Sequence, residues 1–148
     1  MSLPPLPDSA VLLGRRAPDW RGSVRLAAEG LTESGFALPE YGDEMIRMVE
    51  DNGPYIVIAP GLALAHARPG PSVKADGLSI VTLTRPVHFG HPHNDPVTVV
   101  LGLATTDASQ HLAAVAGVAN VFNYESTVDR LAAAVEADEV RRILGLDG

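Results

Sequence analysis

The sequence contains two long runs rich in β-branched residues, Leu78-Ser79-Ile80-Val81-Thr82-Leu83 and Val97-Thr98-Val99-Val100-Leu101-Gly102-Leu103. Almost continuous apolar runs of this length are typical of strands that are buried on both faces of a sheet. Segments with helical periodicity precede the first run and follow the second. The two runs therefore predict a single α/β domain in which helices pack on a sheet.

Shorter strands are expected on the N-terminal side of these runs. Residues 10–13 form a short apolar run that suits an edge strand. Residues 55–59 and 62–65 form two more strand-like runs, which Pro60-Gly61 separates. A turn at Pro60-Gly61 would allow these two short strands to follow each other directly.

Helices are expected on both sides of the strands in the sequence. Asp19 can cap a first helix that stops at Gly35, and Pro39 opens a second helix that ends at Asn52-Gly53-Pro54. Asp107 begins a capping-box spacing, and the helix after it is expected to turn one apolar stripe to the core: Leu112, Val115, Ala119 and Phe122. Two further helical stretches carry Val128, Leu131 and Val135, and then Val140, Ile143 and Leu144.

The composition restricts the class of protein. The chain has 148 residues, of which 46% are hydrophobic and 20% charged, enough apolar material for one core. We expect a flexible N-terminal arm at residues 1–9 and the domain at residues 10–148.

The net charge of −7 and the aromatic content of 5% argue against nucleic acid and anionic membranes as partners. The absence of cysteine excludes disulfides, thiolate metal sites and a cysteine nucleophile.

No segment of the sequence predicts export or membrane insertion. The first seven residues lack a cationic start and contain three prolines, which does not suit a secretory signal. The longest apolar stretch, residues 97–104, is far short of the ~20 residues that a membrane helix needs. We therefore expect a cytoplasmic protein without direct membrane insertion.

Histidines are the main candidates for chemistry. His66 ends a short apolar strand between small residues, so that a large partner could reach its ring. It could equally be an ordinary, partly exposed histidine at a strand end. His111 falls in the first turn of the helix after Asp107, where free N–H groups and the helix dipole favour an anion. Its alternative role is a histidine that flanks the core stripe.

Three further histidines, His88, His91 and His93, lie together in one segment that also contains Asn94 and Asp95. Imidazoles beside a carboxylate suit zinc, nickel or copper. The same segment is rich in turn-forming residues, which explains it as a polar loop between two strands. We favour the loop and predict no metal site and no cofactor.

One segment carries a resemblance to a known family: Gly53-Pro54-Tyr55-Ile56-Val57-Ile58-Ala59-Pro60-Gly61-Leu62-Ala63-Leu64-Ala65-His66-Ala67-Arg68-Pro69. It resembles the active-site segment of enzyme IIA proteins of the mannitol/fructose superfamily of the bacterial sugar phosphotransferase system, and most of all the ascorbate-type branch. The likeness extends over about residues 10–145. It implies a mixed β-sheet flanked by helices on both sides.

The resemblance also implies a function, that of a phosphocarrier. His66 matches the phosphorylated histidine of the family, and His111 matches the second active-site histidine. The implied phosphoryl donor is HPr and the acceptor is an enzyme IIB, typically at a cysteine, with the membrane enzyme IIC involved indirectly. The implied substrate is a sugar or an ascorbate-like sugar acid. A homodimer stays open, as does a regulatory module of the same fold that is switched by phosphorylation.

The sequence departs from the family at several positions around His66. Ala65 stands where many members have proline, and Glu50 and Pro60 stand where mannitol-type relatives carry an arginine and a glutamate. Arg68 is therefore a candidate substitute for the missing arginine. We also expect the rim of a docking surface to form from small residues near His66 and from the loop before the strand, namely Ala65, Ala67, Pro69 and Pro60.

Overall fold

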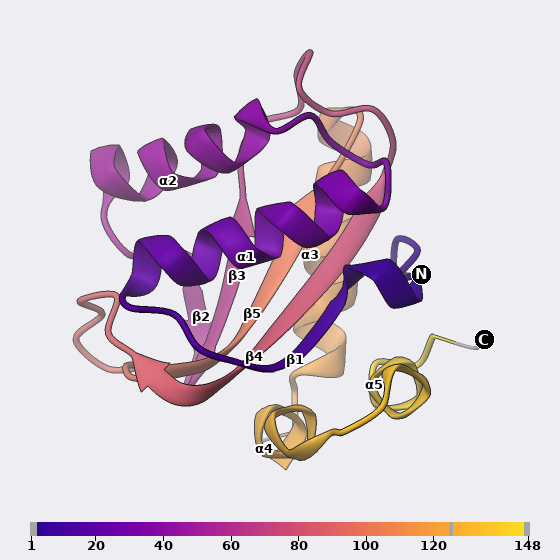
Figure 1. Cartoon of the computed structure of the whole chain (residues 1–148). Coiled ribbons are helices and arrows are strands. Elements are labelled where there is room, and N and C mark those ends of the chain that lie inside the picture. Colours follow the sequence, from indigo (N-terminus) through magenta and orange to yellow (C-terminus); the bar gives the residue numbers. More distant parts are fainter. Residues whose placement is uncertain (1–2, 125, 147–148) are drawn as a thin grey trace.

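The computed structural model describes residues 3–124 and 126–146, and within them five strands form one sheet. The strands follow the order β1-β4-β5-β3-β2 (Figure 1), with the bounds β1 Val11–Arg15, β2 Val57–Ala59, β3 Leu62–His66, β4 Gly77–Val87 and β5 Val97–Ala104. β4 pairs antiparallel with β5, and β2 with β3, whereas β1 is parallel to β4 and β3 to β5. The sheet is therefore mixed.

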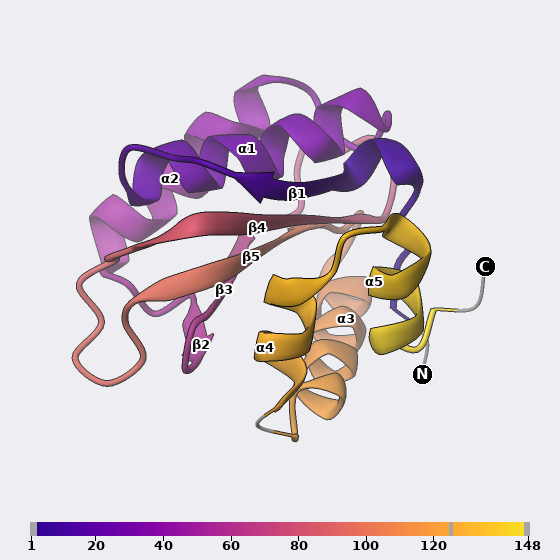
Figure 2. The same ribbon diagram turned by 60° about the horizontal axis from the view of Figure 1, so that its bottom comes forward.

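Helices cover both faces of this sheet (Figures 1 and 2). The helices α1, Trp20–Glu33, and α2, Glu40–Asn52, pack on one face. The other face is covered by α3, Ala108–Val121, α4, Ser126–Ala133, and α5, Ala137–Ile143. The buried apolar residues accordingly form two clusters. The predicted α/β class with helices on both sides of a mixed sheet is confirmed. No described helix has the length and apolarity that crossing a membrane requires.

The predicted helix boundaries follow from side-chain caps. The Asp19 carboxylate accepts a hydrogen bond from the N–H of Gly22 at 2.9 Å, and Asp107 accepts one from Gln110 at 2.8 Å. Both aspartates therefore satisfy amide groups that a helix start leaves without a partner. Gly35 follows the end of α1 with a φ of +80°, a conformation that glycine adopts without strain. These local predictions are confirmed.

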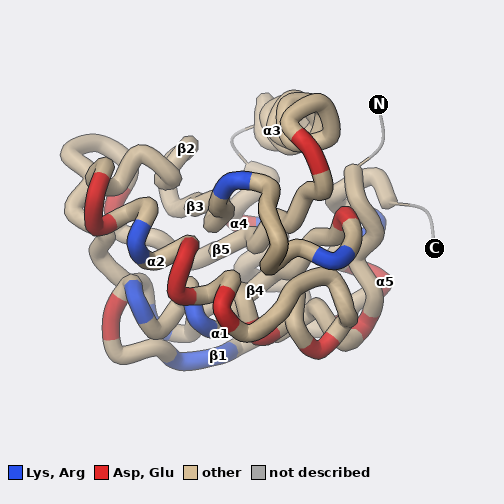
Figure 3. Tube along the Cα trace, turned by 90° about the horizontal axis from the view of Figure 1, so that it is seen from above, with Lys and Arg blue, Asp and Glu red and all other residues tan. Residues whose placement is uncertain are grey.

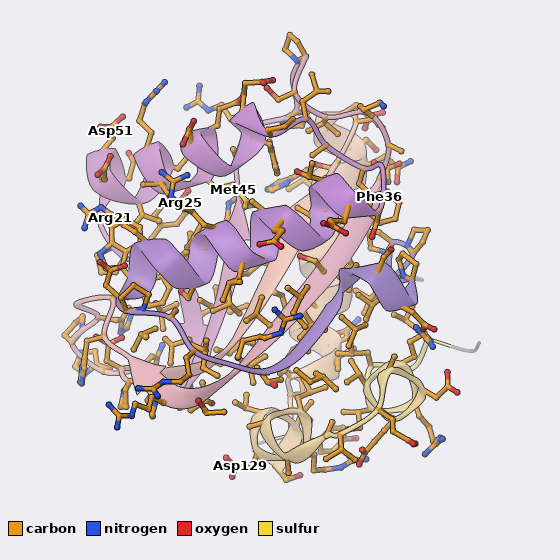
Figure 4. The ribbon with its side chains drawn as sticks, in the orientation of Figure 1. Arg21, Arg25, Phe36, Met45, Asp51 and Asp129 are labelled. Carbon is orange, nitrogen blue, oxygen red and sulfur yellow. The ribbon has the colours of Figure 1, made fainter. Side chains whose placement is uncertain are left out.

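The helices α1 and α2 contact each other along their length. Met45 is 1% exposed, and Figure 4 shows it between the two helices together with Arg25. Arg25 forms an ion pair with Asp43 at 3.1 Å, and Arg21 forms one with Glu50 at 3.0 Å. Because both ion pairs are largely exposed, the apolar contact rather than the charges holds these helices together.

The stripe predicted for α3 is correct for Val115 and Phe122, which are partly buried against the core, but wrong for Leu112 and Ala119, which are exposed. Leu112 is 70% exposed, and the residues of α3 that are buried are Ala114, Gly117 and Val118. A Cβ atom at Gly117 would lie 3.0 Å from the Leu3 side chain, so the small residues allow the N-terminal segment to approach the helix. Val135, expected on a later stripe, is 83% exposed in the link after α4. An alanine-rich helix offers several apolar faces, and its periodicity therefore does not select one.

The N-terminal segment also differs from the loose arm expected at residues 1–9, of which residues 3–9 are described. Leu6 is only 4% exposed, and the Pro5 carbonyl accepts a hydrogen bond from the N–H of Leu78 at 2.9 Å. The Arg141 guanidinium donates to the Leu6 carbonyl at 3.0 Å and pairs with Asp8 at 2.7 Å. This segment is therefore packed against β4 and α5, contacts that the proline-rich sequence does not reveal.

Candidate functional site

His66 is the last residue of β3, and its neighbour on β5 is Leu103. The parallel strands β3 and β5 end side by side, so the site lies at their carboxyl ends, where α/β sheets commonly bind ligands. His66 Nδ1 lies 2.9 Å from the Leu64 carbonyl oxygen. Because a carbonyl can only accept, Nδ1 carries the proton and donates it. The other ring nitrogen, Nε2, is left with a lone pair.

His111 lies beside this ring. It falls in the first turn of α3, which begins after the cap Asp107, and its ring centroid is 5.1 Å from that of His66. The Tyr55 ring also lies beside His66, edge to face, with its centroid 5.8 Å away. The structure therefore brings the two predicted histidines together, although they stand 45 positions apart in the sequence.

Burial keeps both imidazoles neutral. Desolvation lowers the pKa of His66 below its usual 6.5, and a positive charge on His111 would lower it further, while the bond to Leu64 acts in the opposite direction. Desolvation also lowers the pKa of His111. A neutral imidazole with one fixed N–H is a nucleophile at the other nitrogen, so the site can accept an electrophilic group on His66 Nε2.

Two other residues predicted for this site, Ala67 and Arg68, follow His66 directly in the chain. Arg68 is exposed, and Arg68 and Ala67 line a shallow surface pocket of about 210 Å³ together with Glu44, Arg47, Met48 and Asp51 of α2. Figure 3 shows Lys and Arg positions both on α2 and after the end of β3, interspersed with acidic ones. Positive side chains are thus available near His66 from two elements.

The predicted docking rim needs correction at three positions. Ala65 is 0% exposed and Ala67 is 3% exposed, so both side chains belong to the core rather than to a rim. Pro60 is exposed but precedes β3, about 20 Å from His66 along a strand that rises about 3.3 Å per residue. The loop around Pro60 therefore cannot form a rim with residues after His66, because the whole length of β3 separates them.

Sequence reasoning missed the exposed apolar residues that do flank the histidines. Tyr55 is 43% exposed and contacts the His66 ring, and Leu112, directly after His111, is 70% exposed. Tyr55 stands within the quoted active-site segment, which is the signal that could have found it. Leu112 gave no such signal, because a leucine on a helix is normally assigned to the core.

The loop with His88, His91 and His93 lies at the opposite end of the sheet, between β4 and β5. His91 Nδ1 accepts the N–H groups of His93 at 3.1 Å and Asn94 at 3.0 Å, which occupies its lone pair. The Asp95 carboxylate accepts three further backbone N–H groups of this loop. Among the described residues, no three His, Asp or Glu side chains converge in a way that could hold a metal ion.

A mixed sheet covered on both faces, with a neutral histidine pair at its strand ends, defines a domain suited to carrying a transferable group. Residues 5–145 match the model of the family described as phosphoenolpyruvate-dependent sugar phosphotransferase system, EIIA 2. The chain belongs to this family, and it is a phosphocarrier of the phosphotransferase relay.

Particular relatives agree with this assignment. The chain is 37% identical to an ascorbate-specific PTS system EIIA component of Salmonella choleraesuis, over 90% of this chain and 87% of the relative. It superimposes on a PTS IIA (PtxA) from Streptococcus mutans with a TM-score of 0.85 and 34% identity, covering 95% of each chain. The complex of enzyme IIAMTL and phosphorylated enzyme IIBMTL from Escherichia coli has the same fold, with a TM-score of 0.84, 24% identity and coverage of 95% and 97%.

Proposed function

We propose that this phosphocarrier accepts a phosphoryl group on Nε2 of His66 from phosphorylated HPr in the cytoplasm and passes it to an enzyme IIB. The observation that carries the proposal is the hydrogen bond from His66 Nδ1 to the Leu64 carbonyl at 2.9 Å. This bond fixes the tautomer and leaves Nε2 as the nucleophile, next to a second neutral histidine.

The transfer proceeds in two displacements. In the first, the Nε2 lone pair attacks the phosphorus of the donor's phosphohistidine, and the donor ring leaves with the electron pair of the broken P–N bond. In the second, the acceptor's nucleophile attacks the same phosphorus, and the bond to Nε2 breaks with its electron pair returning to His66. Both steps need in-line geometry and hydrogen-bond donors around the phosphoryl oxygens.

His111 and Arg68 supply those donors in this proposal. The His111 ring lies 5.1 Å from His66, which places its N–H within reach of a phosphoryl oxygen on Nε2. Arg68 follows two residues after His66 in an exposed position and offers a guanidinium to the same group. Arg68 would thus take the role of the arginine that mannitol-type relatives carry at the position of Glu50 in this chain. Glu50 itself is an anion and pairs with Arg21 of α1.

The substrate that we propose for the whole transport system is ascorbate or a related sugar acid, with an enzyme IIC as the membrane component. The support is the ascorbate specificity in the name of the 37% identical relative. Enzyme IIB as the acceptor is supported by the complex of the mannitol-type neighbour.

An assay with purified partners tests the transport role against a regulatory one. Isotope-labelled phosphoenolpyruvate, enzyme I and HPr should label the protein, and addition of the ascorbate-type IIB should then remove most of that label within minutes. The control omits IIB and measures the slow loss by hydrolysis. Labelling that no IIB of the ascorbate type can discharge would contradict transport and leave the phosphorylated protein as a switch.

The exposed apolar residues beside the histidines form the surface on which we expect both partners to dock. Leu112→Asp should raise the half-saturating HPr concentration about tenfold, because a charge replaces a large apolar side chain that is 70% exposed next to His111. The maximal rate at saturating HPr should change little. Steady-state phosphoryl transfer at varied HPr concentration measures both quantities.

Val135→Asp is the matched control, because Val135 is also highly exposed but lies in the link after α4. The α4 helix, which leads into this link, lies at the end of β3 away from His66, because its Val128 is close to Gly61 just before β3. This control should leave the half-saturating concentration unchanged. Equal effects of the two substitutions, or no effect of Leu112→Asp, would place the docking surface elsewhere.

The lowered pKa of His66 predicts the pH range in which the site can accept phosphate. Protonation of Nε2 removes the nucleophilic lone pair, and burial shifts that protonation to a pH below 6.5. Titration of the His66 ring by nuclear magnetic resonance should therefore give a midpoint below 6.5. In His111→Ala the midpoint should rise, because the repulsion by a positive His111 is lost. A His66 midpoint above 6.5 in the unchanged protein would contradict the account.

A further inference from the structure

Tyr41 is a buried polar residue directly beneath the histidine site. It belongs to the first turn of α2, and its side chain is only 1% exposed. Burial raises the pKa of its hydroxyl to about 12, so the group stays protonated and able to donate. A buried hydroxyl is costly unless it is fully hydrogen-bonded, and its partners therefore show what it does.

One partner of this hydroxyl lies on β5, and the other lies directly after the end of β3. The N–H of Ala67 donates to Tyr41 Oη at 3.0 Å, and Tyr41 Oη donates to the Leu103 carbonyl at 2.7 Å. Leu103 is the residue of β5 that pairs with His66, and Ala67 is the residue that follows His66. The hydroxyl thus bridges β5 and the chain directly after β3.

His66 lies between two fixed points as a result. On its N-terminal side, its ring bonds to the carbonyl of Leu64 within β3. On its C-terminal side, the next amide is held by Tyr41. Which rotamers a side chain can adopt depends on the φ and ψ angles of its own residue. By holding the peptide between His66 and Ala67, Tyr41 fixes the ψ angle of His66 and so restricts the rotamers that are open to the imidazole.

We propose that Tyr41 is a positioning residue for phosphoryl transfer, whose hydroxyl locks the backbone after His66 to β5 and thereby holds Nε2 in line for attack. The inference rests on the proposed role of His66 as the phosphoryl acceptor. Because Tyr41 is buried, it acts through His66 and touches neither partner. Its loss should lower the maximal transfer rate without changing the affinity for HPr.

Tyr41→Phe tests this proposal, because it removes the hydroxyl and keeps the ring that fills the core. The maximal rate of phosphorylation by HPr should fall about tenfold, with an unchanged half-saturating HPr concentration. The nitrogen chemical shifts of the His66 ring should also change from a single tautomer with the proton on Nδ1 toward a mixture of both tautomers. This spectroscopic readout needs no phosphoryl transfer.

Thr82→Val is the matched control. Thr82 Oγ1 is likewise buried and accepts a backbone N–H, that of Gly14 at 2.8 Å, so this substitution also deletes a hydroxyl and leaves an amide unpaired. Thr82 pairs with Val99, which in turn pairs with Leu62 at the far end of β3. Thr82→Val should lower the unfolding temperature as Tyr41→Phe does, but should leave the His66 tautomer and the transfer rate unchanged.

Several outcomes would overturn the proposal. Wild-type His66 shifts and a wild-type maximal rate in Tyr41→Phe would show that the hydroxyl only stabilises the fold. The same changes in Thr82→Val would attribute them to lost stability. If Tyr41→Phe does not fold, amide exchange in the unchanged protein decides: the Ala67 N–H should be as protected as amides within β3, and rapid exchange would refute the bridge.

The proposal and the proposed role of His66 can fail separately. A changed His66 tautomer in Tyr41→Phe together with phosphate on another residue would leave Tyr41 as a positioning residue for a ring that is not the acceptor. Phosphate on His66 with an unchanged tautomer and rate in Tyr41→Phe would refute the role of Tyr41 alone.

Discussion

His66→Ala should abolish phosphorylation of the protein by HPr, with a loss of at least about 100-fold in incorporated label. The imidazole supplies the only nucleophile that the proposal uses, and alanine leaves no ring nitrogen at the end of β3. The fold should survive, because His66 is only half-buried and its ring bonds to a backbone carbonyl of its own strand. The measurement is label incorporation from isotope-labelled phosphoenolpyruvate through enzyme I and HPr.

His93→Ala is the control for the loss of a histidine as such. His93 is exposed in the loop at the other end of the sheet, and its removal should leave labelling unchanged. Circular dichroism and thermal unfolding of both variants establish that they are folded. Full labelling of a folded His66→Ala protein would remove His66 from the mechanism.

The second large effect is expected for His111. Deletion of its side chain in His111→Ala should slow the transfer from HPr by 10- to 100-fold, which corresponds to about 1.4–2.8 kcal/mol of transition-state stabilisation. The reason is the loss of a hydrogen-bond donor to the phosphoryl group from a ring whose centroid lies 5.1 Å from that of His66. Rapid-quench measurement of a single turnover gives the transfer rate directly.

A conservative variant separates the lost donor from lost packing. His111→Gln keeps an N–H donor on a side chain of similar length, and it should recover part of the rate that His111→Ala loses. Phosphate should remain on His66 in both variants, because His111 assists without accepting it. Unchanged rates in His111→Ala would exclude it from the reaction.

Local sequence signals predicted most of the fold and the position of both histidines. A helix cap involves residues only three positions apart, as at Asp19 and Asp107, so the local sequence is enough to predict it. The same holds for the buried strands β4 and β5, which the sequence marks by their continuous apolar runs. The quoted segment around His66 predicted the family. Strand β3 pairs with β5, so that His66 lies beside Leu103 and near His111. Only the family resemblance, and no local signal, indicated this pairing.

Features that depend on distant contacts escaped prediction. The exposed side of α3 follows from the approach of Leu3 to Gly117, which lie more than a hundred residues apart. Ala67 looked like a surface residue because it follows an active-site histidine, yet Tyr41 and the core enclose it. The role of Tyr41 depends on three elements meeting at one hydroxyl, and no spacing in the sequence indicates such a meeting.

The central claim is that one defined atom, Nε2 of His66, carries the phosphoryl group. Nuclear magnetic resonance of the isotope-labelled protein, phosphorylated by HPr, measures this directly, because the ring nitrogen that bears phosphorus shows a coupling to it. The account predicts this coupling at Nε2 of His66, with Nδ1 still protonated and bonded to the Leu64 carbonyl. Phosphorus on Nδ1 of His66, or on His111, would contradict it.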